Sequence, residues 1–126
     1  MYPPASTMPT NAFFRFAHLM RAARSMPGMP AIDPVEERML NALSEYWRVD
    51  AAPSVLEAMQ LNFGVSPTTV HRRLKTLHRK GLIDLAAQAD DSRCKRVMPT
   101  SLAMAYFGRL SECMAEALGA TTQQPN

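Results

Sequence analysis

The side chains best suited to chemistry lie in the segment that begins at Ser66. Ser66 can accept a hydrogen bond from an unpaired backbone N–H, and Pro67 suits a first helical turn, so a helix is predicted to begin here. Val70, Leu74 and Leu77 recur at intervals of four and three residues and would form one buried stripe. The remaining surface would combine hydroxyls with long cations, the mixture that a helix needs in the major groove of DNA. The DNA-binding residues predicted on this helix are Ser66, Thr68, Thr69, His71, Arg72, Arg73, Lys75, Thr76 and Arg79.

Helical geometry assigns different roles to these side chains. Thr68 and Thr69 fall in the first turn, nearest to base edges. Arg72 lies opposite the buried stripe and is predicted to contact a base. Contacts with phosphate set affinity and salt dependence and carry no sequence information. The cations predicted to contact phosphate are Arg73, at the flank of the stripe, and Lys75, Arg79 and Lys80, toward the helix end.

A β-hairpin is predicted after the basic helix. Gly81 can adopt the left-handed turn that ends a helix, and two strand-like runs then enclose a polar turn within residues 84–98. This hairpin would be a wing, with Lys95 on its returning strand and Arg93 near its tip. An arginine there can enter a narrow minor groove, and Asp91 could pair with Arg93 and orient it. The alternative is an ordinary turn of polar residues.

Capping signals predict the helices that must hold this segment. Asp33 is a good N-cap, Pro34 suits the first helical position, and Glu36 completes a capping box. Three other helices are predicted at residues 11–25, at 54–60, and from Thr100 or Ser101 to a stop at Gly119. The predicted apolar anchors are Val35, Met39, Leu43 and Tyr46 or Trp47 in the second helix, Val55, Leu56 and Met59 in the third, and Ala103, Phe107, Leu110, Met114 and Leu118 in the last.

These elements predict a mainly α fold with a small β-hairpin: a winged helix-turn-helix, with recognition helix 66–80, flanked by N- and C-terminal helices. The predicted organisation is a disordered N-terminus at 1–9, one domain at 10–118 with terminal dimerisation helices at 10–26 and 100–118, and a disordered tail at 119–126. The terminal helices hold more large apolar groups than so small a head could cover. The predicted dimerisation residues are Phe13, Phe16, Met20, Phe107, Leu110 and Met114.

Charge is concentrated where the chemistry is predicted. The chain has 126 residues and a net charge of +3, yet residues 67–96 hold eight of its 14 lysines and arginines and only three of its 11 acidic residues. One basic surface on a near-neutral body is typical of phosphate binding. The alternative is a merely solvated helix face. With no run of about 18 apolar residues, no membrane span is expected.

Catalytic and metal chemistry find little support in the sequence. Cys94 and Cys113 have no metal-ligand spacing and are expected to be reduced in a cytoplasm. Cys94 could alternatively be a redox switch, because Lys95 and Arg96 would favour its thiolate. No catalytic arrangement of side chains or glycine-rich phosphate loop occurs, so no enzyme, metal site or cofactor is expected.

The wing carries a specific resemblance. Asp91-Ser-Arg93 followed by Val97-Met-Pro-Thr100 resembles the wing and the wing-to-helix passage of MarR-family regulators. The stretch from Leu61 to Pro67 is also similar to LexA-type DNA-binding domains. The MarR resemblance covers roughly residues 33–118 and implies a homodimer whose terminal helices pack across a two-fold axis. It places Thr68, Thr69, Arg72 and Arg73 in the major groove and Arg93 in the minor groove.

The resulting hypothesis is a cytoplasmic, sequence-specific transcriptional regulator that binds double-stranded DNA as a homodimer. Its operator would be roughly palindromic. A small-molecule effector could bind where the terminal helices meet the head, lined by Tyr46, Trp47 and Phe107, unless these aromatics belong to the core. One alternative is a winged-helix protein-interaction module, or a DNA-binding part of a replication or mobile-element assembly, that acts with a different protein. Another is a nonspecific architectural DNA binder.

Overall fold

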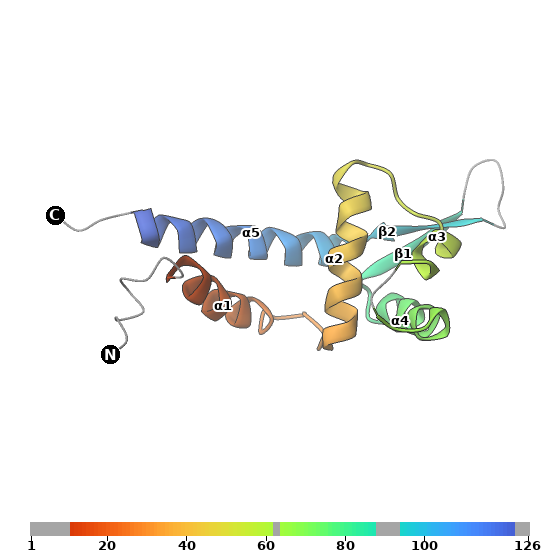
Figure 1. Ribbon diagram of the computed structural model, residues 1–126, viewed down its shortest axis with the longest axis horizontal. Helices are drawn as coiled ribbons and strands as arrows, with labels where there is room; N and C mark the ends of the chain where they lie inside the picture. The colour runs from red at the N-terminus through yellow and green to blue at the C-terminus, as the bar shows by residue number, and fades with distance from the viewer. Residues whose placement is uncertain (1–10, 62–63, 88–93, 123–126) are drawn as a thin grey trace. The chain divides into compact units, whose positions relative to one another are not determined.

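The computed structural model describes residues 11–61, 64–87 and 94–122 (Figure 1). The described chain contains five helices and one two-stranded sheet, which confirms the predicted mainly α fold with a β-hairpin. It divides into a central unit, Pro30–Met104, and a terminal unit, Met1–Met29 with Ala105–Asn126. The elements in order are α1 (Asn11–Ala23), α2 (Pro34–Arg48), α3 (Val55–Met59), α4 (Pro67–Arg79), β1 (Ile83–Ala87), β2 (Lys95–Pro99) and α5 (Ser101–Thr122).

Helix α2 begins with the predicted capping box. The Asp33 carboxylate accepts a hydrogen bond from the Glu36 N–H at 2.8 Å, and the Glu36 carboxylate accepts one from the Asp33 N–H at 2.9 Å. Two backbone donors that the first turn leaves unpaired are thereby satisfied. The helix buries Met39 and Leu43 as predicted, and also Leu40, which the sequence analysis did not include.

Helix α3 is a single short turn with a capping box of its own, formed by Ser54 and Glu57. It packs on α4 and β2, and its fully buried residue is Ala58. The prediction of Leu56 as an anchor was wrong, because 67% of that residue is exposed. Leu56 precedes Ala58 by two positions and therefore lies on the opposite side of the helix.

Helix α4 forms as predicted. The Ser66 hydroxyl accepts a hydrogen bond from the Thr69 N–H at 3.2 Å, so it is the N-cap. The stripe of Val70, Leu74 and Leu77 is buried throughout. Residues 80 and 81 end the helix, and Gly81 has a φ of +77°, a conformation that a residue with a Cβ rarely adopts.

The hairpin is held to the rest of the central unit along β2. Strands β1 and β2 pair antiparallel, with Leu85 opposite Val97. The Val97 N–H donates to the Pro53 carbonyl at 2.8 Å, and the Val97 carbonyl accepts from the Trp47 indole N–H at 2.9 Å. The base of the hairpin is therefore tied to α2 and to the segment before α3. Pro99 ends β2 as predicted.

Helix α5 is longer than the sequence predicted. Thr100 caps it, since its hydroxyl accepts from the Ala103 N–H at 3.1 Å. The prediction that Gly119 ends the helix, and that a loose tail begins there, was wrong because α5 continues to Thr122. A glycine inside a helix costs only about 1 kcal/mol relative to alanine and does not by itself stop it.

The buried face of α5 also differs from the predicted one. Met114 and Leu118 were predicted in its apolar stripe, but they are 53% and 57% exposed. Small and aromatic residues one position earlier are buried instead, because the contact face turns by one residue. Ala103 is buried as predicted, and the other buried residues of the helix are Tyr106, Cys113 and Ala117, each one position before a predicted residue.

The terminal unit joins α1 to α5. The Cys113 thiol donates to the Leu19 carbonyl at 3.4 Å, so the two helices lie side by side. Between them is an apolar cavity of about 190 Å³. It is lined by Ala12, Phe13, Phe16, Met114, Ala117 and Leu118. Within the described residues, no helix is long and apolar enough to cross a membrane.

Candidate nucleic-acid interface

The exposed face of α4 carries the candidate interface. Thr68, Arg72 and Lys75 are exposed on the side away from the buried stripe, and Arg79 is exposed near the helix end. Among the described residues, no ion pair engages Arg72, Lys75 or Arg79. This face therefore presents three positive charges and an exposed threonine hydroxyl to solvent.

Three hydroxyl groups near this face are already engaged by hydrogen bonds within α4 and its N-cap. The Ser66 hydroxyl caps α4 and lies 3.0 Å from the Thr69 hydroxyl. The Thr76 hydroxyl donates to the Arg72 carbonyl at 3.1 Å and accepts from the Arg79 guanidinium at 3.3 Å. Thr76 thus directs Arg79 along the helix surface. The DNA contacts assigned to these hydroxyls remain predictions.

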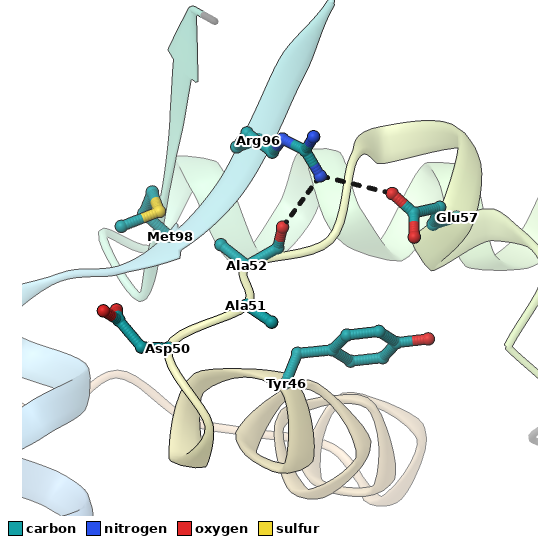
Figure 2. A pocket seen from close by; sticks show the side chains of 7 residues that line it. All are labelled: Tyr46, Asp50, Ala51, Ala52, Glu57, Arg96 and Met98. Carbon is teal, nitrogen blue, oxygen red and sulfur yellow. Dashed lines mark hydrogen bonds and ion pairs between the residues drawn. The ribbon is translucent and has the colours of Figure 1, made fainter.

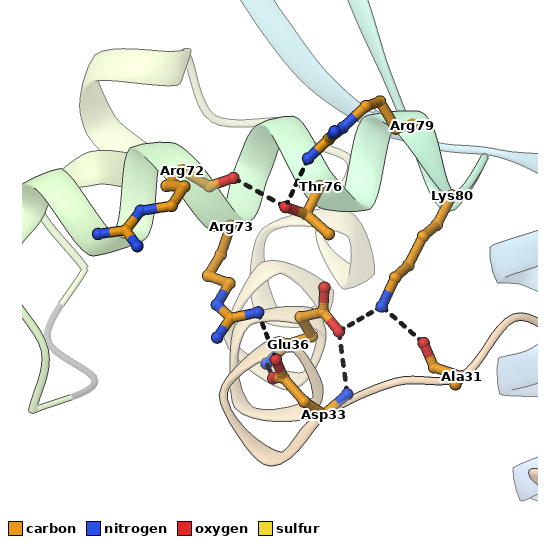
Figure 3. A network of polar contacts seen from close by, with 8 residues as sticks. All are labelled: Ala31, Asp33, Glu36, Arg72, Arg73, Thr76, Arg79 and Lys80. Carbon is orange, nitrogen blue, oxygen red and sulfur yellow. Dashed lines mark hydrogen bonds and ion pairs between the residues drawn. The ribbon is translucent and has the colours of Figure 1, made fainter.

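A network of ion pairs joins α4 to the start of α2 (Figure 3). The Arg73 guanidinium pairs with the Asp33 carboxylate. The Lys80 ammonium lies 2.7 Å from Glu36 Oε1 and 2.6 Å from the Ala31 carbonyl oxygen. Glu36 is fully buried, and no partner of its Oε2 lies among the described residues. The capping box of α2 therefore also holds the second half of α4.

This network is not predicted by the sequence. Lys80 is predicted to contact phosphate, but its ammonium is engaged by the Glu36 carboxylate and the Ala31 carbonyl. Arg73 was assigned to phosphate, and that assignment remains a prediction beside its observed pairing with Asp33. A usable signal existed, because Arg73 and Lys80 are seven residues apart and share one face of α4. His71, also predicted to bind DNA, is half-buried.

The wing strand contributes one exposed cation, Lys95, and one half-buried cation, Arg96, which is held by other parts of the chain. Lys95 is exposed at the start of β2. Arg96 Nη1 donates to the Ala52 carbonyl at 3.1 Å and to the Glu57 carboxylate at 3.3 Å (Figure 2). Arg96 therefore braces β2 against the start of α3. The predicted wing-tip residues Arg93 and Asp91 lie outside the described residues.

A cleft of about 550 Å³ adjoins this brace (Figure 2). Hydrogen bonds from the Ser54 backbone N–H and then from its hydroxyl, helped by Arg96, lower the pKa of Glu57 below its usual value. The carboxylate is thereby kept charged as the partner of Arg96. The cleft is lined by Tyr46, Asp50, Ala51, Ala52, Glu57, Arg96 and Met98.

The remaining candidate residues lie elsewhere. Of the predicted dimerisation residues, Phe13 and Met114 are exposed, and Phe16, Met20, Phe107 and Leu110 are half-buried. Their role at a dimer interface stays a prediction. Cys94 is exposed and Cys113 is buried. No group of three potential metal ligands occurs in the part of the chain that the structure describes.

Comparison with known proteins identifies the fold. No protein-family model matches the chain, and no curated protein matches its sequence. The transcriptional regulator Tm0710 from Thermotoga maritima is similar in structure, with a TM-score of 0.60 and 16% identity over 86% of this chain and 75% of that one. Apo MarR from E. coli gives a TM-score of 0.54 and 16% identity, covering 100% of this chain and 88% of MarR.

A third similar structure is that of BpsR from Bordetella bronchiseptica, whose DNA binding is regulated by 6-hydroxynicotinic acid. Its TM-score is 0.50, with 16% identity over 100% of this chain and 87% of BpsR. At these identities the comparisons establish architecture. The chain has the MarR-like winged helix-turn-helix fold that its basic helix and wing predicted.

Proposed function

We propose that this protein is a sequence-specific, DNA-binding transcriptional regulator and not an enzyme. The observation that carries the proposal is the surface of α4. A capped helix buries Val70, Leu74 and Leu77 on one side and exposes Arg72 and Lys75 on another. A winged helix-turn-helix inserts such a helix into the major groove. The similar proteins Tm0710 and BpsR, a transcriptional regulator and a regulated DNA binder, support the same function.

The exposed residues of α4 take distinct roles in this proposal. Thr68 and Arg72 contact base edges, because they lie in the first turns and face away from the core. Lys75 and Arg79 contact phosphates and set affinity without reading sequence. Lys95 and Arg93 contribute from the wing. The remaining proposed contacts are Ser66, Thr69, His71, Arg73 and Thr76.

The proposed assembly is a homodimer formed through the terminal unit. Phe13 and Met114 leave more than half of their surface exposed there, and such apolar groups are typical of an interface. A two-fold dimer would read two half-sites of a roughly palindromic operator in the cytoplasm. BpsR supports a small-molecule effector by analogy. Sedimentation equilibrium tests the dimer, and a monomer at micromolar concentration would contradict it.

Selection of bound sequences from a random duplex library tests the proposed function directly. The selected duplex and a scrambled duplex of equal length are then titrated with protein over a range of salt concentrations. A palindromic winner bound at least about a thousandfold more tightly than the scrambled duplex is the expected result. No enriched sequence, with weak binding that disappears as salt rises, would refute specific recognition and redirect the search to a protein partner.

A further inference from the structure

We infer that Asp33 is an internal competitor of DNA phosphate for Arg73, and that it limits the affinity and the salt dependence of DNA binding. The inference rests on the proposed function and adds a regulatory contact to it. The contact is the ion pair that joins the start of α2 to the middle of α4 (Figure 3). In this view Arg73 exchanges one anionic partner for another when DNA binds.

Exposure distinguishes this ion pair from its neighbour. The side chains of Arg73 and Asp33 are 37% and 33% exposed, so water and ligands reach both. Glu36, by contrast, is fully buried beneath Lys80, and that pair also includes the Ala31 carbonyl. The Arg73 pair can therefore open without exposing the core, whereas the Lys80 pair is a fixed part of the fold.

The energies favour exchange once DNA is close. An ion pair that remains half-exposed contributes little to stability, because water screens it and two side chains must be ordered. Duplex DNA carries a dense line of phosphates, and neutralising each one releases bound counterions. Arginine also binds phosphate through two parallel hydrogen bonds. A phosphate at this position can therefore displace the carboxylate of Asp33.

Asp33 would weaken DNA binding in two ways. It occupies Arg73 in the unbound protein, and its negative charge would repel a phosphate that approaches the same guanidinium. Arg72, the preceding residue, points away from Asp33 in Figure 3, and no ion pair engages it within the described part of the chain. The two adjacent arginines thus differ: Arg72 is available at once, and Arg73 only after its carboxylate is displaced.

The decisive variant is Asp33→Asn, because it removes the charge and keeps the helix cap. Asparagine caps helices about as well as aspartate. The hydrogen bond from the backbone N–H of residue 33 to the Glu36 carboxylate is unaffected by the substitution. Asp33→Ser is a second variant that retains a capping oxygen, should the first lower the melting temperature. DNA binding is measured by fluorescence anisotropy on a specific duplex and on a scrambled duplex, each over a range of salt concentrations.

We expect Asp33→Asn to bind both duplexes about two- to fivefold more tightly near physiological salt, the range typical of an exposed ion pair. The plot of log affinity against log salt should become steeper by up to about 0.9, the value for one fully neutralised phosphate, because competition from Asp33 leaves Arg73 on phosphate in only part of the wild-type complexes. Glu45→Gln is the matched control. It removes one negative charge at the other end of α2, where Glu45 pairs with Arg48, and should change neither quantity.

Arg73→Gln completes the test. On that background Asp33→Asn should no longer raise affinity, because the cation for which the carboxylate competes is absent. Unchanged affinity and slope in Asp33→Asn, or an equal gain on the Arg73→Gln background, would overturn the inference while leaving DNA binding intact. A wild-type protein that binds neither duplex would instead overturn the proposed function, and this inference with it.

Discussion

Replacement of Lys80 by methionine should destabilise the fold far more than loss of an ordinary surface lysine. The Lys80 ammonium lies 2.7 Å from a carboxylate oxygen of Glu36, which is fully buried. Methionine retains an unbranched apolar chain but supplies no charge and no hydrogen-bond donor. The Glu36 carboxylate would then be buried with only the Asp33 N–H as a described donor.

The size of the effect follows from burial. Removal of one partner from a buried ion pair costs about 3–5 kcal/mol, because an uncompensated charge remains. Water can partly replace Lys80, since 27% of its side chain is exposed, and we therefore expect a loss of about 2–3 kcal/mol. The double variant Glu36→Gln, Lys80→Met should recover much of this loss. Glutamine keeps an oxygen that can accept from the Asp33 N–H and buries no charge.

Urea unfolding followed by far-UV circular dichroism measures these free energies, at one fixed protein concentration. Lys75→Met is the matched control on the same helix. Lys75 is exposed, and it forms no ion pair with any residue that the structure describes. Its effect should stay within about 0.5 kcal/mol. A Lys80→Met variant as stable as Lys75→Met, or a double variant less stable than Lys80→Met, would refute the reasoning.

Three further predictions concern the interface and the wing. Arg72→Ala should cost about 1–3 kcal/mol of binding and relax sequence preference, whereas Lys75→Ala should weaken all duplexes alike; equal behaviour in the library selection would contradict these roles. Trp47→Phe should cost about 1–3 kcal/mol of unfolding free energy, because it leaves a part-buried β2 carbonyl without its indole donor; an unchanged urea midpoint would count against that brace. Because the pKa of Glu57 is lowered in the folded protein, its charge stabilises the fold above the unfolded pKa, and this stabilisation is lost as pH falls through the folded pKa. The melting temperature of Glu57→Gln should therefore fall less steeply with decreasing pH than that of the wild type.

The parts of the fold that the sequence predicts are those fixed by local physics. Asp33 and Ser66 accept hydrogen bonds from N–H groups three residues away. Gly81 adopts a left-handed conformation, which glycine reaches without help from a distant residue. The buried stripe of α4 follows from helical periodicity alone. These signals act over a single turn, so a short window of sequence contains the whole cause.

The features that sequence reasoning missed depend on contacts between distant segments. Asp33 and Arg73 are 40 positions apart, so the spacing of Arg73 and Lys80 could indicate a shared face of α4 but could not identify their carboxylate partners. Its apolar side chain predicts that Leu56 anchors α3 in the core. The helix packs through Ala58 instead, because α4 and β2 lie on that side. Gly119 predicts the end of the last helix, but α5 continues to Thr122, because helix propensity is only one small contribution to where a helix ends.

The positive charge of a recognition helix is therefore not the same as its capacity to bind DNA. Five cations lie from Arg72 to Lys80, but Lys80 neutralises a buried carboxylate and Arg73 a half-exposed one. The first pair joins α4 to the start of α2, and the second is the pair that we propose exchanges with phosphate. A substitution that adds charge by removing an acid from α2 should consequently have opposite results at the two positions. At Asp33 it should strengthen DNA binding, and at Glu36 it should loosen α4, the helix that is proposed to contact DNA.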